Sequence, residues 1–308
     1  MRIIYVFVFI LLIESSCDFK KYEIQYDLKT GTTYNLEITA EQNLVQKESG
    51  KDQVIHTKLI SGMAYHVLDI DDNNNYLMEV YFTLLYYDMK SPFLNMTMDS
   101  RKLGEKEDIY SMVLRELINK PFRIRMNLKG EINGVDGLNE YFQRITARFE
   151  GLGPQQRLQI RQILKKAYGE EAFQSNMEMM TSMFPDHLVR RGSKWTNNLM
   201  LRKGVSVELH NTYRLTDIKD NMYYISDKAY ADSPSGSSQG NEQMRYDIHG
   251  EQNGNYKINV NTGWIVEANL NQSFEGKVIV SPGENAPKGM EWPVSIESSL
   301  QMKGSEVR

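Results

Sequence analysis

The pattern that most constrains the fold is an alternation of apolar and polar residues with a period of two. It is clearest over residues 205–216, where the apolar members are Val205, Val207, Leu209, Tyr213 and Leu215. A period of two puts the apolar side chains on one face of a β-strand and the polar side chains on the other. Such strands belong to antiparallel sheets that face the core on one side and water on the other. The chain is therefore predicted to be mainly β.

Two strand-rich blocks flank a helical middle. Period-two patterns dominate residues 22–132 and 185–302, with one helix predicted near 105–119. Residues 137–184 instead carry apolar side chains three and four positions apart, which predicts helices. The second block is expected to contain short strands, among them 222–225, 244–248, 256–260, 264–270, 277–280 and 294–302. We expect residues 17–308 to form a single large α+β domain.

The order of these blocks predicts twisted antiparallel sheets or an unclosed barrel, with helices covering one side. Three segments of the first block recur in order in the second: 28–34 in 189–195, 69–76 in 217–223, and 122–132 in 256–265. The segments LKTGTTY and VRRGSKW, for example, share an aliphatic residue, a base, a glycine, a hydroxyl residue and an aromatic residue. Either the chain contains two similar sheet halves separated by a helical insertion, or strands and turns simply reuse the same residue types.

The N-terminus has the features of a secretory signal peptide over residues 1–16. Arg2 precedes an unbroken apolar run from Ile3 to Ile13, and two serines then lead to the single cysteine, Cys17. Eleven helical residues span about 16 Å, roughly half of a bilayer core, which disfavours a permanent membrane span. A cysteine directly after small residues resembles the bacterial lipobox, although Glu14 stands where an aliphatic residue is usual.

We therefore expect Cys17 to carry a lipid that anchors the mature chain in the membrane. Ordinary cleavage by signal peptidase and an uncleaved anchor are the two alternatives. The expected location is the cell envelope, on the outer membrane and facing the periplasm.

Charge and cysteine content exclude several classes of function. Lys and Arg number 36 against 40 Asp and Glu, a net charge of −4. Nucleic-acid binding needs a concentrated positive field, so no nucleic-acid partner is expected. A single cysteine excludes an intramolecular disulfide, a Cys-X-X-Cys pair and a thiolate metal site.

The metal-binding patterns are incomplete, and we expect neither a metal nor a cofactor. Asp69, Asp71 and Asn73 resemble the start of a calcium loop. However, Asn74 and Val80 replace the glycine and the bidentate glutamate that such a loop requires. The segment therefore predicts a turn between two strands.

The sequence gives little support for catalysis. Residues 236–240, GSSQG, match the pattern G-x-S-x-G, but that motif works on a strained turn between a strand and a helix. Here it lies in a polar, serine-rich loop. We expect the protein not to be an enzyme, and a hydrolase is the least favoured alternative.

A predicted helix carries a stripe of large apolar side chains at Phe173, Met177, Met180 and Phe184. Methionine is flexible and recurs at adaptable binding surfaces. The stripe could line a groove for a hydrophobic ligand or an envelope protein, or it could simply pack on a sheet.

The signal-like run, Cys17 and four further blocks carry a resemblance to a known family. These blocks are LKTGTTY, NLKGEINGVDGL, FPDHLVRRGSKW and NTGWIVEANL. The chain resembles an uncharacterised family of Bacteroidota-type envelope lipoproteins, domain of unknown function 6263. The resemblance implies a lipoprotein of mostly β architecture and brings no catalytic residues. It favours a lipid-anchored binding or scaffolding protein, with a periplasmic carrier of a lipid as the alternative.

Overall fold

The structure is a computed structural model that describes residues 20–48, 51–102, 109–147, 153–201, 207–233, 244–282 and 288–307. The expected signal peptide, Cys17 and the GSSQG segment lie outside the described residues.

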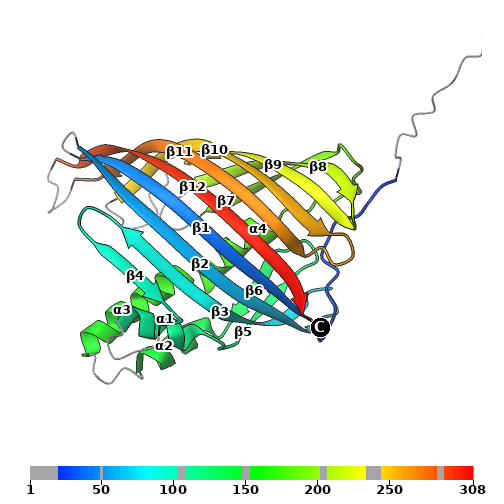
Figure 1. The fold of residues 1–308 in the computed structure, drawn as a ribbon, viewed down its shortest axis with the longest axis horizontal. Coiled ribbons are helices and arrows are strands. Elements are labelled where there is room, and N and C mark those ends of the chain that lie inside the picture. Colours follow the sequence, from blue (N-terminus) through cyan, green and yellow to red (C-terminus); the bar gives the residue numbers. More distant parts are fainter. Residues whose placement is uncertain are drawn as a thin grey trace, which may run out of the picture.

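Within the described residues, twelve strands form one antiparallel sheet (Figure 1). The strands are β1 (Thr33–Glu48), β2 (Lys51–Ile70), β3 (Tyr76–Lys90), β4 (Asn95–Asp99), β5 (Phe122–Met126), β6 (Ile132–Asp136), β7 (Lys194–Leu201), β8 (Val207–Lys219), β9 (Met222–Asp232), β10 (Met244–Asn259), β11 (Ile265–Val280) and β12 (Met290–Val307). Their order is β6-β5-β3-β2-β1-β12-β11-β10-β9-β8-β7, and β4 pairs with β3 outside this path. The edge strands β6 and β7 do not pair with each other. The predicted mainly β architecture of antiparallel strands without closure is therefore confirmed, and the strands form one sheet rather than several.

Four helices complete the described fold: α1 (Ile109–Leu117), α2 (Leu138–Ala147), α3 (Pro154–Tyr168) and α4 (Glu170–Thr181). Pro154 is the first residue of α3, where its missing N–H costs nothing. Gly169 separates α3 from α4 and donates its N–H to the Lys165 carbonyl at 3.0 Å. The three helices α2, α3 and α4 follow one another between β6 and β7.

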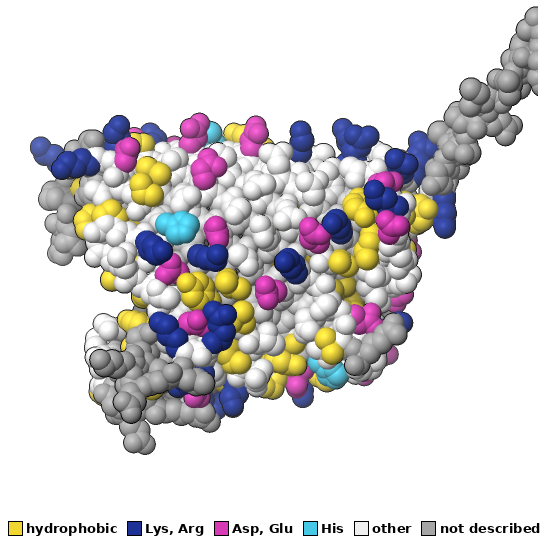
Figure 2. Space-filling view, in the orientation of Figure 1, with side chains coloured by type: hydrophobic (Ala, Val, Ile, Leu, Met, Phe, Trp, Pro, Cys, Tyr) yellow, Lys and Arg dark blue, Asp and Glu magenta, His cyan; other side chains and the backbone are white. Residues whose placement is uncertain are grey.

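The outer face of the central strands meets water. Glu41 and Lys58 stand opposite each other on β1 and β2 and form an exposed ion pair at 2.7 Å. Lys257 and Glu267 do the same on β10 and β11 at 2.5 Å. On the face shown in Figure 2, acidic and basic side chains are interspersed. Exposed pairs of this kind contribute little to stability, so the fold depends on the opposite, inner face.

Several strands are longer than expected. The predicted strands 244–248 and 256–260 fall in one strand, β10, apart from residue 260, and the predicted strands 264–270 and 277–280 fall in β11, apart from residue 264. The alternation is lost in the middle of β10 because glycines occupy inner positions there. A Cβ atom at Gly250 would lie 2.2 Å from the Ser273 carbonyl oxygen on β11. The close approach of the two strands explains why glycine interrupts a strand that nevertheless continues.

The first pair of sequence repeats has the same local geometry in both blocks. Gly31 and Gly192 have φ angles of 79° and 89°. Each donates its N–H to a strand carbonyl, that of Val67 at 2.8 Å and that of Leu215 at 2.7 Å. Directly after each acceptor the strand pairing shifts register, in β2–β3 and in β8–β9. A glycine turn and a bulge matched in this way favour two similar sheet halves over mere reuse of turn residues.

Helix α4 ends earlier than the sequence indicated. Its predicted stripe ran to Phe184, before Pro185, whereas the helix stops at Thr181. The Ser182 N–H still donates to the Glu178 carbonyl at 2.9 Å. The chain then leaves the helix, and the Met183 carbonyl accepts a hydrogen bond from a side chain of β7.

Helix α4 and the residues after it connect the two edges of the sheet. On the β6 side, Gln174 Nε2 donates to the Ile132 carbonyl at 2.9 Å, and the Ile132 N–H donates to Glu178 Oε1 at 3.2 Å. On the β7 side, Trp195 Nε1 donates to the Met183 carbonyl at 2.7 Å. Unpaired edge strands expose backbone groups that can pair with other chains. The side chains of α4 satisfy such groups on β6.

Replacing Glu178 with alanine should destabilise the fold. Glu178→Ala removes the acceptor for the Ile132 N–H and leaves that group without its partner, which costs about 1–3 kcal/mol. Chemical denaturation should therefore show a lower free energy of unfolding. The control is Glu171→Ala on the exposed side of the same helix, where we expect a change of less than about 0.5 kcal/mol. Equal effects of the two substitutions would contradict the role of Glu178.

Candidate functional site

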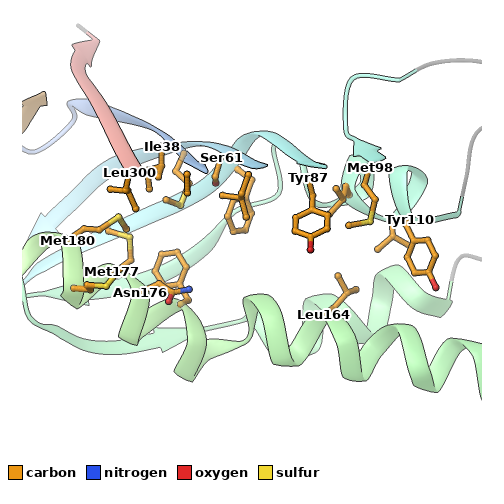
Figure 3. A pocket seen from close by; sticks show the side chains of 18 of the residues that line it. Ile38, Ser61, Tyr87, Met98, Tyr110, Leu164, Asn176, Met177, Met180 and Leu300 are labelled. Atoms are coloured by element: carbon orange, nitrogen blue, oxygen red, sulfur yellow. The ribbon is translucent and has the colours of Figure 1, made fainter. Parts of the chain in front are cut away.

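A cavity of about 550 Å³ lies between the inner face of the sheet and the helices (Figure 3). Strands β1 to β4 and β12 line one side, and α1, α3 and α4 line the other. In Figure 3, Ile38 and Ser61 reach in from the strands, whereas Leu164, Met177 and Met180 reach in from the helices. Ligand pockets in proteins commonly measure about 300–1,000 Å³. The cavity is large enough for a small apolar ligand.

The lining is predominantly apolar. Its polar groups are the side chains of Ser61 and Asn176 and the hydroxyls of Tyr87 and Tyr110. No charged side chain is among the described residues that line it. Such a surface favours hydrocarbon over water.

Three of the four residues of the predicted stripe meet in this cavity. Phe173, Met177 and Met180 line it from α4. Phe184 lies elsewhere, because α4 has already ended, and its ring packs against Tyr26 with centroids 4.9 Å apart. The three α4 residues are also buried members of the main hydrophobic core. The three residues therefore both pack on the sheet and line the cavity. From the sequence alone, these two roles are alternatives.

A buried tyrosine holds α4 against the sheet at the inner part of the cavity. The Tyr65 hydroxyl on β2 donates to the sulfur of Met177 at 3.1 Å, and it lies 3.4 Å from the sulfur of Met63. Tyr65 is 1% exposed, and burial raises the pKa of its hydroxyl far above the usual value. The neutral hydroxyl therefore remains a hydrogen-bond donor to the methionine at all physiological pH values.

Sequence reasoning did not identify the strand residues of the cavity. The sequence feature that could have identified these strand residues is a small side chain at a position that faces the core. On β1 the inner residues run from Tyr34 through Leu36 and Ile38 to Ala40, and on β2 Ser61 lies among larger residues. Small side chains at these positions leave space where large ones would fill the core.

A row of polar side chains also crosses the inner face of β9 to β12. Gln252 Nε2 donates to Asp227 Oδ2 at 2.6 Å, and Gln272 Nε2 donates to Gln252 Oε1 at 2.7 Å. The row continues where the Ser298 hydroxyl donates to Gln272 Oε1 at 3.2 Å. We call Asp227, Gln252, Gln272 and Ser298 the polar row.

The carboxyl group of Asp227 is incompletely paired. Asp227 is 2% exposed, and its Oδ1 atom has no hydrogen-bond partner among the described residues. Burial raises the pKa of Asp227 to about 6, against the opposing effect of the hydrogen bond from Gln252. A buried, half-satisfied carboxylate is costly and is therefore a candidate functional group.

The segment that resembles the start of a calcium loop forms a turn in the structure. Asp71 Oδ1 accepts the N–H groups of Asn73 at 2.9 Å and Asn75 at 2.8 Å, which is the geometry of a polar turn. Within the part of the chain that the structure describes, no three His, Cys, Asp or Glu residues are grouped so that they could hold a metal ion. None of the described helices has both the length and the hydropathy to cross a membrane.

The fold and the cavity together define a mainly β protein in which an unclosed antiparallel sheet and helices border an apolar cavity. The chain belongs to DUF6263, a family of unknown function, whose family model matches residues 73–265. The predicted membership of this family is therefore confirmed. No curated protein matches the sequence.

Several solved structures show weak similarity to the fold. A structure of lipovitellin, solved to show its lipid–protein interactions, has a TM-score of 0.47 and 13% sequence identity over 91% of this chain. This chain spans 25% of that lipovitellin chain. An outer membrane channel from Pseudomonas putida F1 has a TM-score of 0.21 and 8% identity over 91% of this chain and 97% of the channel. Similarities at these scores carry no argument about function.

The stability of the protein should depend on the protonation of Asp227. The folded chain holds this proton up to a pH of about 6, whereas the unfolded chain releases it near pH 3.8. The folded state therefore binds more protons between these values, so its free energy of unfolding falls as pH rises through them. The loss should be up to about 3 kcal/mol.

Asp227→Asn should remove this pH dependence, whatever constant effect the substitution has on stability. Denaturation at several pH values measures it. Asp232→Asn, at an exposed position of the same strand, is the control and should keep the wild-type pH dependence. A wild-type slope that survives in Asp227→Asn would show that another group is responsible.

Proposed function

We propose that the protein is a non-enzymatic, lipid-anchored protein of the cell envelope that binds a molecule with an apolar chain in its cavity. The observation that carries the proposal is the cavity of about 550 Å³, bounded by a sheet and helices and lined almost entirely by apolar side chains. The helices α1, α3 and α4 would serve as a cover for the ligand on one side of the sheet.

The apolar surface of the cavity supports a ligand. The cavity opens partly to solvent, so its apolar lining meets water until something covers it. Leaving this apolar surface in water costs free energy. An apolar ligand recovers it by removing the lining from water and restoring van der Waals contacts.

The lining favours binding over hydrolysis. A hydrolytic site needs a nucleophile, a base and donors for a developing charge. The described residues of the lining supply two tyrosine hydroxyls, one serine and one amide, with no histidine or carboxylate among them. Ser61 therefore has no base beside it that could activate its hydroxyl.

Filling the cavity with protein should abolish binding. Ala40→Phe adds a ring at an inner position of β1, where Ala40 lines the cavity. The probe is N-phenyl-1-naphthylamine, an uncharged dye whose fluorescence rises in apolar surroundings. We expect saturable binding by the wild type and at least a tenfold weaker affinity in Ala40→Phe.

The matched control is Thr39→Phe, the adjacent residue, which points to the outer face because strand side chains alternate. Thr39→Phe should bind the dye as the wild type does. Equal losses in both variants, or no saturable binding by the wild type, would contradict the proposal.

Envelope anchoring rests on the N-terminal sequence and needs its own test. If a lipid on Cys17 holds the chain on the membrane, Cys17→Ala should move it to the soluble fraction of the envelope. Cell fractionation with immunoblotting measures this, and salt washing separates lipid anchoring from electrostatic adhesion. Membrane retention of a correctly processed Cys17→Ala protein would refute the anchor.

A further inference from the structure

The polar row interrupts the mostly apolar inner surface of β9 to β12. On β12, Ser298 lies between Leu300 and Met302 on one side and Ile296 and Val294 on the other. The next two strands repeat the pattern, because Gln272 stands opposite Ser298 and Gln252 stands opposite Gln272. Burying amides and a carboxyl among apolar residues costs free energy unless all of them are hydrogen-bonded. Packing of the core alone therefore does not explain four adjacent polar side chains at this position.

The row retains hydrogen-bonding capacity of both kinds. Asp227 Oδ1 has no partner among the described residues and can accept a hydrogen bond. Gln252 and Gln272 each use one of their two amide hydrogens within the row. A hydroxyl group would accept a hydrogen bond from a free amide hydrogen of the row and donate one to the second lone pair of an amide oxygen, and it is the smallest group that does both.

A small hollow lies beside the row. Its volume is about 10 Å³, and Asn211, Gln252 and Gln272 provide its polar lining. This space is close to that of one water molecule, and a hydroxyl oxygen is of the same size. Asn211 is 2% exposed and Gln252 is 4% exposed, so the polar groups are removed from bulk water.

The hollow adjoins the large cavity. Met179, Met180 and Leu300 line both spaces. Two of these three side chains are methionines, whose unbranched chains change conformation readily. A rearrangement of these side chains would connect the two spaces.

We infer that the polar row is a head-group site, which takes a hydroxyl group of an uncharged amphipathic ligand whose apolar chain occupies the large cavity. The inference rests on the proposed function and names the class of ligand: molecules such as monoacylglycerols, with a hydroxyl-bearing head and one apolar chain. The carboxylate of a fatty acid is disfavoured at this site because the row already holds the buried carboxyl group of Asp227, and no basic side chain is among the described residues that line the hollow.

Competition between ligands that share a chain and differ in the head tests the inference. N-phenyl-1-naphthylamine bound to the full wild-type chain is displaced with monolaurin, methyl laurate or lauric acid. We expect monolaurin to displace the dye at about tenfold lower concentration than methyl laurate, which has no hydroxyl group. Equal potency of the two esters would overturn the inference and leave the proposed function standing.

A variant separates the row from the rest of the cavity. Gln272→Leu should remove the advantage of monolaurin and leave the potency of methyl laurate unchanged. The control is Asn271→Leu, the adjacent exposed residue on the outer face, which should keep the advantage. Persistence of the advantage in Gln272→Leu would overturn the inference. Should this variant fail to fold, the comparison of the esters on the wild type still decides.

Different results contradict the proposed function and the head-group site. If the wild type does not bind the dye, or none of the three laurate compounds displaces it, the proposed function is contradicted and the head-group site with it. If the compounds displace the dye without regard to the head group, only the head-group site is contradicted.

Discussion

The structure depends on hydrogen-bond partners for the backbone groups at the two edges of the open sheet. Eleven strands in one continuous order end at β6 on one side and β7 on the other, and each edge presents backbone groups without a strand partner. Helix α4 and the residues after it contact both edges through Gln174, Glu178 and Met183. Edge strands left unpaired promote association between chains. The helix that protects the edge also becomes one wall of the interior.

The cavity follows from this arrangement. Helix α4 is held at the sheet edge and by the hydrogen bond between Tyr65 and Met177, and a space remains between the helix and strands β1 to β4. Ala40 and Ser61 on the facing strands are too small to fill the remaining space. Methionines on α4 border that space, and their flexibility suits ligands of variable shape. Packing of the helix and accommodation of a ligand are thus properties of the same side chains.

Sequence patterns predicted the main features of the fold because they reflect local physical rules. The period-two alternation of residues 205–216 predicted antiparallel strands, and the helical spacing of residues 137–184 agrees with three helices. Local rules could not locate the end of α4, because the hydrogen bond from Trp195 to Met183 joins residues 12 positions apart. Nor could they show β10 as one strand. The glycine at position 250 is required by the close approach of β11, which the residues around it in the sequence do not reveal.

The cavity and the polar row could not be predicted from the sequence, because their residues come together only in the folded chain. Three stripe residues were identified, but Ala40 and Ser61 matter only because a helix more than 100 positions away faces them. Asp227, Gln252 and Gln272 come from three strands and look like ordinary polar residues in sequence. The lipid at Cys17 and the envelope location stay predictions, because they depend on residues that the structure does not describe.

Native mass spectrometry of the protein purified from its own cells, without detergent that strips ligands, tests the central claim most directly. The account predicts a wild-type chain that carries one small apolar molecule per protein, which organic extraction removes and identifies. It also predicts that Ala40→Phe, purified in the same way, carries none. A wild-type protein that is folded and free of any such molecule, or an equal ligand load in Ala40→Phe, would contradict the claim that the interior is a binding site.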